Sequence, residues 1–357
     1  MQIKVEGRLI LFMIVFILLG LLTIHSASTV WTTYLYDDPY FYMKRQALFS
    51  IIGVGCMIFI RKIPLNDMKK YVPLLFICTL ILLALVLIPG IGIVRGGARS
   101  WIGIGSFSIQ PSEFMKIALI LMAAYIFERF RNHPFLLIQL LTLMVFALIM
   151  LQPDLGTGLV LLGTIFVLMY VYGLKMKVII WTALLGLTGL VILIVSAPYR
   201  LRRLTSYLNP WADPQGDGFQ MIQSLLAIGP GKLFGRGYQN GMQKHFYLPE
   251  PQTDFIFAIY AEEFGYIGAV LFVLAVLWLF LFCMKVSQAI YDSFKRTVFI
   301  GIVMMITLQM VMNISVVIGL IPVTGITLPF MSYGGSSLVL TFISYGLLLN
   351  ITKRLKI

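Results

Sequence analysis

Acidic side chains occur repeatedly at the beginning of apolar runs in this sequence. Glu113 and Asp154 each follow a proline-containing turn, and Asp254 directly precedes the apolar residues 255–258. A carboxylate at such a position can simply cap free N–H groups and complement the helix dipole, which contributes about 1 kcal/mol. Asp254, however, faces into an apolar run, where a carboxylate can have a raised pKa suited to a general base. Asp254 is therefore our candidate catalytic residue, whereas capping and function are equally open for Glu113 and Asp154.

Further charges lie inside the apolar runs themselves. Lys116 follows Glu113 by three residues, so the two side chains can pair on one helix face. Charges within a membrane-spanning segment are costly and usually line a cavity or a pathway. Lys116 is thus either half of a structural ion pair or a substrate contact. Glu262 and Glu263 are adjacent and cannot share a helix face, so at least one of them is expected to line a cavity.

A short loop at residues 94–103 combines arginines, glycines and a tryptophan. Arg99 could hold a pyrophosphate group through bidentate contacts, while Trp101 would sit at the membrane interface. The alternative is that the loop carries only topology-determining charges and an aromatic anchor. Both interpretations are open at this point.

These residues belong to a chain that is too apolar for a water-soluble domain. Of its 357 residues, 60% are hydrophobic and 11% are charged, whereas soluble domains have roughly 25% charged residues. The net charge of +13 is spread over short loops between apolar runs, which indicates membrane topology rather than nucleic-acid binding. We therefore predict an all-α, polytopic protein that forms a single integral membrane domain over residues 1–357.

The apolar runs approach the length of roughly 17–25 residues that a helix needs to cross the hydrocarbon. They predict about ten transmembrane helices, with a long extracytoplasmic loop, residues 198–254, between the seventh and the eighth. Within this loop, Phe219–Ile228 could form an amphipathic helix along the interface. The predicted spans are 9–26, 46–61, 71–88, 112–128, 135–151, 155–172, 178–197, 255–283, 297–320 and 329–350.

The basic residues predict the orientation of the chain. An even number of spans places both termini on one side, and most Lys and Arg residues of the short loops lie on that side. Cytoplasmic loops are enriched in such residues, so both termini are expected in the cytoplasm. The short loops on the opposite side contain only Lys44, Arg45, Arg95 and Arg99.

With this topology the acids lie at the outer ends of their helices, which limits the chemistry that they can perform. The sequence has no GxxxxGK[ST] nucleotide-binding loop, and an outward-facing site could not draw on ATP, so no nucleotide cofactor is expected. The substrate must therefore arrive already activated. A lipid-linked pyrophosphate sugar fits, because its tail uses the bilayer, its leaving group needs cations and its acceptor hydroxyl needs a carboxylate base.

Several motifs resemble the SEDS family of bacterial shape, elongation, division and sporulation proteins, and the resemblance covers essentially the whole chain. The stretch 206–211, followed by Gln243 and Lys244, is similar to the division and sporulation branch (FtsW or SpoVE type) rather than the elongation branch (RodA type). Lys232 departs from the family pattern, which usually has glycine there. The motifs that carry the resemblance lie at residues 99–102, 110–113, 152–157, 229–231, 247–255 and 329–337.

The resemblance implies a peptidoglycan glycosyltransferase in the bacterial cytoplasmic membrane. Its substrates would be lipid II and undecaprenyl-pyrophosphate-linked glycan, and its partner a class B penicillin-binding protein that acts as transpeptidase. Carried over by motif, Asp254 matches the essential aspartate, and Lys116 and Asp154 match polar residues of the central cavity. The remaining substrate-binding candidates lie in or beside the same motifs, namely Glu113, Arg99, Trp101, Glu250 and Ser336.

In the expected reaction, Asp254 deprotonates a sugar hydroxyl of the acceptor, which attacks the anomeric carbon and expels the lipid pyrophosphate with inversion. Lys116, Arg99, helix N-termini and a divalent cation, Mg²⁺ or Mn²⁺, bound near Asp254 would stabilise the leaving group. Two alternatives are a lipid II flippase and a scaffold without catalytic activity. The absence of paired broken helices weakens the flippase alternative, and a scaffold should tolerate Asp254→Asn.

Overall fold

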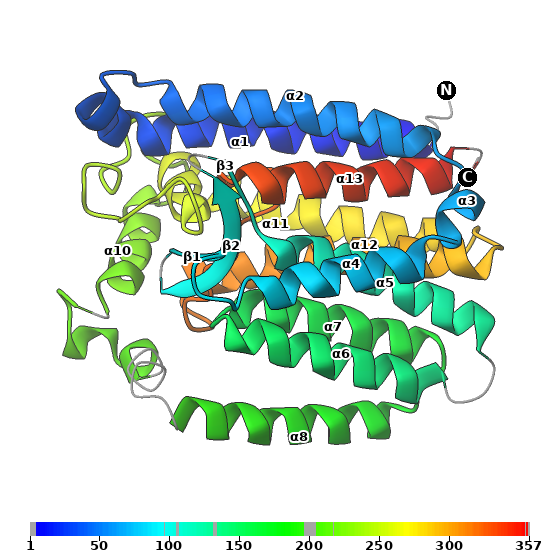
Figure 1. The fold of residues 1–357 in the computed structure, drawn as a ribbon. Helices are drawn as coiled ribbons and strands as arrows, with labels where there is room; N and C mark the ends of the chain where they lie inside the picture. The colour runs from blue at the N-terminus through cyan, green and yellow to red at the C-terminus, as the bar shows by residue number, and fades with distance from the viewer. Residues whose placement is uncertain are drawn as a thin grey trace.

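The computed structural model describes residues 5–95, 97–104, 107–130, 134–195, 205–216, 218–353 and 355. Long helices lie side by side and form a bundle (Figure 1). Every predicted span coincides with a helix in this part of the chain. The helices are α1 (Val5–Tyr36), α2 (Phe41–Lys62), α4 (Val72–Leu85), α5 (Pro111–Arg129), α6 (Pro134–Leu151), α7 (Leu155–Val171), α8 (Met176–Val195), α11 (Ile256–Ser287), α12 (Ser293–Val317) and α13 (Gly335–Thr352).

Six of these helices are long and apolar enough to cross a membrane, counted over the described residues: α1, α2, α6, α11, α12 and α13. Two more, α4 and α7, are apolar but shorter. Helix α5 carries Glu113 and Lys116 in its first two turns. The chain is therefore built as a multi-pass membrane protein, as its composition predicts.

Helix α1 is longer than its predicted span, 9–26, because polar residues continue the helix beyond the apolar run. Their hydroxyl groups donate to carbonyl groups one turn earlier, so the helix needs no external partner for them. Ser28 Oγ donates to Ile24 O at 2.7 Å, and Thr32 Oγ1 donates to Ser28 O at 2.9 Å. A search for apolar runs alone misses such an extension.

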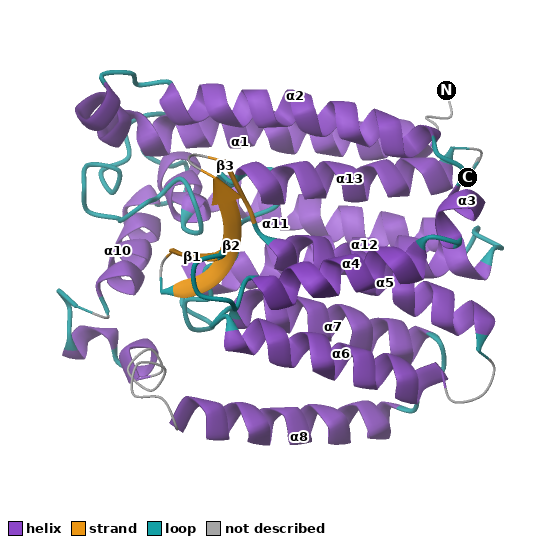
Figure 2. Ribbon diagram, in the orientation of Figure 1, coloured by secondary structure: helices purple, strands orange, loops and turns teal. Residues whose placement is uncertain are grey.

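The expected all-α fold omits a small antiparallel sheet (Figure 2). We interpreted residues 94–103 as a loop. The described residues of this stretch, 94–95 and 97–103, lie in a hairpin between β1 (Gly92–Arg95) and β2 (Ala98–Ile104), and β3 (Phe107–Ile109) pairs with β2. Gly97 adopts φ +82° in the turn, a conformation that glycine tolerates without steric cost. The glycines that suggested a flexible loop are thus also the residues that permit a tight hairpin.

The centre of the bundle is α12, which packs against α5, α7 and α11. Helix α13 packs extensively on α2, because glycines allow close approach: a Cβ at Gly53 would lie 2.2 Å from the Phe342 ring, and one at Gly346 would lie 2.8 Å from Met57 O. Helix α8 packs on α7 and lies at the edge of the bundle in Figure 1. The start of α1 and the end of α13 lie at the same end of the bundle, near the short helix α3 (Leu65–Lys69).

The described residues of the long loop between α8 and α11 form several short elements. The loop contains η1 (Pro210–Ala212), η2 (Gly229–Gly231) and α10 (Phe219–Ile228), the helix expected within it, which packs on α11. Helix α11 is kinked at Gly265, where φ is +70°. The kink exposes backbone groups that pair with the loop: Tyr266 N donates to Lys232 O at 2.8 Å, and Ile267 N donates to Leu233 O at 3.1 Å.

Candidate functional site

Asp254 lies two residues before the start of α11 and is partly exposed. Its Oδ1 accepts a hydrogen bond from Thr253 Oγ1 at 2.9 Å. Its backbone carbonyl oxygen accepts one from Asn313 Nδ2 at 2.7 Å, and the same nitrogen donates to Ile326 O at 2.7 Å. Asn313 of α12 therefore holds the Asp254 backbone and the segment before α13 at fixed positions relative to each other.

Lys116 lies in the interior of the bundle, one turn into α5. Its side chain is only 4% exposed, and its Nζ lies 2.8 Å from Glu113 Oε1. The ammonium also donates to Gln309 Oε1 of α12 at 2.9 Å, and Gln309 Nε2 donates to Thr327 O at 3.1 Å. The predicted pairing of Glu113 with Lys116 is confirmed, and Gln309 connects that pair to the segment that Asn313 also binds.

The amides Gln309 and Asn313 are absent from the residues that sequence reasoning selected. They are four residues apart in a largely apolar helix, so they lie on one helix face. This spacing was a usable signal, because a buried amide needs hydrogen-bond partners. The charged residues alone do not indicate these two amides.

Asp154 is the N-cap residue of α7, and its Oδ1 accepts from Thr157 N at 3.1 Å. Its Oδ2 accepts from Gln110 Nε2 at 2.9 Å and from Ser112 Oγ at 3.4 Å. Desolvation by the surrounding residues raises the pKa of this carboxyl group above its usual value. The capping alternative thus describes Asp154 correctly, and the contact with Gln110 joins the motif at 110–113 to the motif at 152–157.

Arg99 and Trp101 both lie in β2. The Arg99 side chain packs over Gly92 of β1, where a Cβ would lie 2.8 Å from Arg99 Cγ. The guanidinium that contacts the Trp101 ring is that of Arg95, whose Cζ lies 5.3 Å from the ring centroid. The sheet adjoins α5 through β2 and α13 through β3. Both residues therefore lie in the strand that adjoins α5, the helix of Glu113 and Lys116.

Glu250 and Ser336 occupy different surroundings. Glu250 is exposed, and its carbonyl oxygen accepts from Thr253 N at 3.1 Å in the turn that leads to Asp254. Ser336 lies in the first turn of α13, and its Oγ is sheltered from solvent without a hydrogen-bond partner among the described residues. The motifs that contain them meet directly, because Tyr333 N donates to Gln252 O at 2.8 Å.

Glu262 and Glu263, about two turns into α11, both hold the long loop in place. Glu263 is 1% exposed; its Oε1 accepts from Ser26 Oγ and lies 3.4 Å from Lys244 Nζ. Glu262 is fully buried and accepts from Met242 N at 2.7 Å and from Gln243 N at 3.2 Å. The two carboxylates accept hydrogen bonds from different donors, although a Cβ at Gly241 would lie within 3.3 Å of an oxygen of each.

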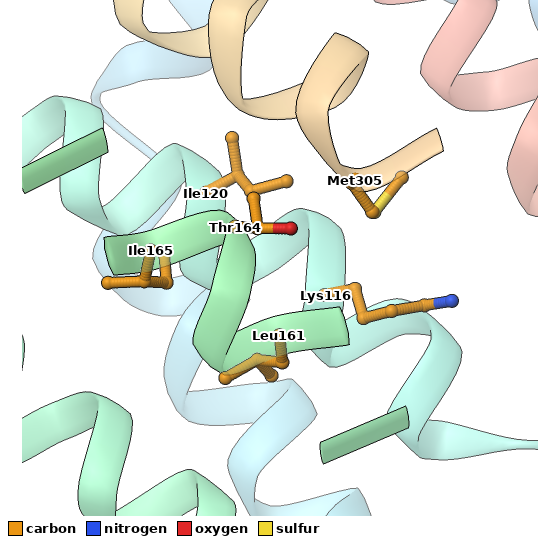
Figure 3. Close-up of a pocket in the computed structure, with 6 residues that line it drawn as sticks. All are labelled: Lys116, Ile120, Leu161, Thr164, Ile165 and Met305. Carbon is orange, nitrogen blue, oxygen red and sulfur yellow. The ribbon is translucent and has the colours of Figure 1, made fainter. Parts of the chain in front are cut away.

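A small pocket beside Lys116 lies between α5, α7 and α12 (Figure 3). It is too narrow to hold a water molecule. The aliphatic part of Lys116 contributes to its wall, and the amine points away from Thr164 and Ile165. This space separates packed helices and is not a binding site for a sugar.

The candidate divalent cation has few potential ligands. The described residues contain no group of three or more His, Cys, Asp or Glu side chains that could hold a metal ion. Mg²⁺ is commonly bound through one or two carboxylates together with substrate phosphates. The donor set here fits an ion that a phosphate-bearing substrate brings to a single carboxylate, and does not fit a cage formed by the protein alone.

Comparison with known proteins places these features in a wider context. Residues 7–357 match the family model of FtsW, RodA and SpoVE, described as "Cell cycle protein". Stage V sporulation protein E of Bacillus subtilis (strain 168) is 49% identical, with 98% of each chain covered. "Probable peptidoglycan glycosyltransferase FtsW" of Geobacter sp. (strain M18) is 39% identical, with 99% of each chain covered.

Two solved structures share the fold. A chain of a peptidoglycan synthase complex, described under "Structural coordination of polymerization and crosslinking", superposes with a TM-score of 0.77 at 32% identity, with 97% of each chain covered. The rod shape determining protein RodA of Thermus thermophilus superposes with a TM-score of 0.72 at 30% identity, covering 97% of this chain and 96% of that one.

Proposed function

The chain belongs to the FtsW, RodA and SpoVE family of cell cycle proteins, and from this premise we propose that Asp254 is the general base of a glycan polymerisation reaction. The protein is a peptidoglycan glycosyltransferase of the FtsW and SpoVE type, a member of the SEDS family. Its identity with the sporulation and division relatives, 49% and 39%, exceeds its 30% identity with RodA.

The roles proposed for Asp254 and Lys116 depend on one observation. Two amide side chains of α12 connect these two residues. Asn313 binds the backbone of Asp254 and Ile326 O, and Gln309, one turn away, binds Lys116 and Thr327 O. Asp254 and the Lys116 ammonium group are thereby both positioned relative to Ile326 and Thr327. Fixed donors and acceptors of this kind lower the reorganisation that a reaction requires.

In the proposed reaction, Asp254 accepts the proton of an acceptor sugar hydroxyl of lipid II. The oxygen forms a bond to the anomeric carbon of the growing strand, and the bond from that carbon to the undecaprenyl pyrophosphate breaks with inversion. The Lys116 ammonium has three N–H donors, of which Glu113 and Gln309 engage two. The third would donate to a phosphate oxygen of the leaving group.

The other predicted residues take supporting roles in this proposal. Asp154 orients Gln110 and Ser112 at the N-terminal end of α5. Arg99 and Trp101 present a cation and an aromatic ring from the sheet beside it. Glu250 offers a polar group in the turn before Asp254, and Ser336 offers one in the first turn of α13. A Mg²⁺ or Mn²⁺ ion, held by Asp254 and substrate phosphates, would supply charge neutralisation for the leaving pyrophosphate.

The proposal also includes a partner and an orientation. A class B penicillin-binding protein would crosslink the strands, in keeping with the synthase complex that shares this fold. Both termini would lie in the cytoplasm, and the long loop with Asp254 outside. The start of α1 and the end of α13 lie at one end of the bundle, which supports an even number of crossings.

The test is reconstitution of the full chain in liposomes with labelled lipid II and its transpeptidase partner. We expect glycan polymer from the wild type and a loss of about 10²–10⁴ in rate from Asp254→Asn, the usual contribution of a positioned base. Addition of a chelator should slow polymerisation until Mg²⁺ or Mn²⁺ is restored. Polymer made equally well by Asp254→Asn would favour the scaffold alternative, and transfer of lipid II without polymer would favour the flippase.

A further inference from the structure

An open pocket lies at the loop-bearing end of the bundle, between α10, the loop after it and α11. Its volume is about 330 Å³, at the lower end of the range for small-molecule sites, about 300–1,000 Å³. Tyr247 in its wall precedes Asp254 by seven residues, so the two lie at most about 25 Å apart along the chain. The residues that line the pocket are Gln223, Leu226, Pro230, Arg236, Met242, Gln243, Tyr247 and Glu262.

The inner wall of this pocket is rigidly built. The Glu262 carboxylate accepts the N–H groups of Met242 and Gln243 and is fully buried. A Cβ at Gly241 would lie 2.9 Å from Glu262 Oε2, so the loop passes as close to the carboxylate as a glycine allows. Arg236 N donates to Glu262 O at 3.0 Å. The wall is therefore fixed before any ligand arrives, which lowers the entropic cost of binding.

Three other lining residues have groups that the protein does not fully use. Gln243 Oε1 is sheltered from solvent and has no hydrogen-bond partner among the described residues. The Arg236 side chain is 38% exposed, and its Nε lies 4.0 Å from Glu262 Oε1, too far for a hydrogen bond. Tyr247 is half-exposed and contributes an aromatic surface with a hydroxyl group. The pocket thus presents an unmet acceptor, a guanidinium and an aromatic ring.

The charges of this pocket select an uncharged ligand. The positive charge of Arg236 is offset by the carboxylate of Glu262 beside it, so neither an anion nor a cation gains from entering. An N-acetylated sugar matches the remaining groups: its hydroxyl oxygens can accept from Arg236, its apolar face can cover Tyr247 and Met242, and its acetamido N–H can donate to Gln243 Oε1 once that side chain turns into the pocket. We propose that this pocket is a glycan subsite that binds one N-acetylated hexosamine ring.

This inference rests on the proposed function for its meaning, because the ring would belong to the growing strand. A strand held both at Asp254 and in this pocket would stay bound between additions. The subsite would therefore determine how many units are added before the strand leaves.

The experiment measures binding and strand length separately. The probe for binding is chitotetraose, titrated into the full chain in lipid nanodiscs. Loss of one hydrogen bond should weaken binding about five- to tenfold in Gln243→Leu, and loss of the aromatic face should do the same in Tyr247→Leu. With lipid II as substrate, both variants should release shorter strands than the wild type at equal consumption of lipid II.

Matched controls lie on the same elements but outside the pocket. Gln220→Leu changes an exposed glutamine of α10, and Phe234→Leu changes a ring that is 80% exposed; neither should alter chitotetraose affinity. The inference is overturned if the wild type shows no saturable binding, if the two pocket variants bind as well as the controls, or if a free stem peptide binds in place of the sugar. Asp254→Asn should still bind the probe, so failure of the catalytic proposal would be distinguishable.

Discussion

Asn313 satisfies two backbone carbonyl groups that belong to segments far apart in the sequence. Both Asp254 O and Ile326 O lie 2.7 Å from its Nδ2. A shift of about 1 Å in a reacting group can cost as much as 100-fold in rate. The position of the candidate base therefore depends on a side chain that itself takes no part in the reaction.

We predict that Asn313→Leu lowers the rate of glycan polymerisation about 10- to 100-fold and destabilises the protein by about 1–3 kcal/mol for each unsatisfied carbonyl. Asn350 provides a matched control, because it binds Ile60 O and Ile63 O at 2.9 and 2.6 Å near the opposite end of the bundle. Asn350→Leu should lose similar stability but keep its rate per folded molecule. Equal losses of rate in the two variants would contradict a positioning role.

A second prediction concerns the buried ion pair of Lys116 and Glu113. Lys116→Met leaves an uncompensated carboxylate in the interior and should destabilise the fold by about 3–5 kcal/mol. The double variant Lys116→Met/Glu113→Gln should regain most of this stability in thermal unfolding but remain inactive with lipid II. Lys44→Met serves as control, since its pair with Asp38 is 67% exposed on the lysine side and contributes little. Activity of the double variant near the wild-type level would show that Lys116 has only a structural role.

For single residues, the positions of the charged side chains were easier to predict from the sequence than the contacts of the buried amides. The pair formed by Lys116 and Glu113 followed from their spacing, and the position of Asp254 before α11 followed from the apolar run behind it. The contacts of Gln309 and Asn313 reach loops more than ten residues away in the chain, and spacing within a helix cannot identify such partners. Arg95, rather than Arg99, contacts Trp101 because the hairpin register brings them together.

Among the elements, the kink in α11 determines how the long loop is attached. Gly265 has φ +70°, and a Cβ there would lie 2.2 Å from Gly235 N and 2.7 Å from Leu233 O. Substitution must therefore displace the loop backbone or straighten the helix. The loop carries Lys244 and several residues that line the open pocket. Its attachment to α11 therefore affects the position of the chain that leads to Asp254.

Gly265→Ala should detach residues 232–237 from α11 and reduce polymerisation at least about tenfold, because a side chain at this φ is strained as well as crowded. Faster hydrogen exchange of the Tyr266 and Ile267 amides would report the detachment. Gly55→Ala is the control, since a Cβ there meets nothing within 4 Å. Unchanged exchange at Tyr266 in Gly265→Ala would refute the attachment argument.

The helices were more predictable than the other elements. Apolar length determines where a chain crosses a membrane, and each predicted run contains a helix in the described residues. The ends were less accurate, because residues such as Thr32 continue α1 through hydroxyl bonds to its own backbone. The hairpin of β1 and β2 was missed because its glycines fit both a flexible loop and a tight turn.

For the molecule as a whole, the orientation in the membrane is the main prediction that awaits measurement. Tyr291, between α11 and α12, is fully exposed, and Phe234 is 80% exposed in the long loop. In a background without Cys56, Cys78 and Cys283, a cysteine at 234 should react with a membrane-impermeant maleimide in intact cells. A cysteine at 291 should react only after permeabilisation. The reverse pattern would place Asp254 on the cytoplasmic side and exclude the proposed reaction.

The buried ion pair in α5 also bears on how the protein responds to the electric field across the membrane. The field does work of about 2.3 kcal/mol per elementary charge for each 100 mV, but Lys116 and Glu113, held 2.8 Å apart, carry no net charge when they move together. The membrane potential therefore does little work on this part of the bundle when it moves. Strand synthesis would draw its driving force from the pyrophosphate linkage of the substrate and would continue in a depolarised cell for as long as lipid II is supplied.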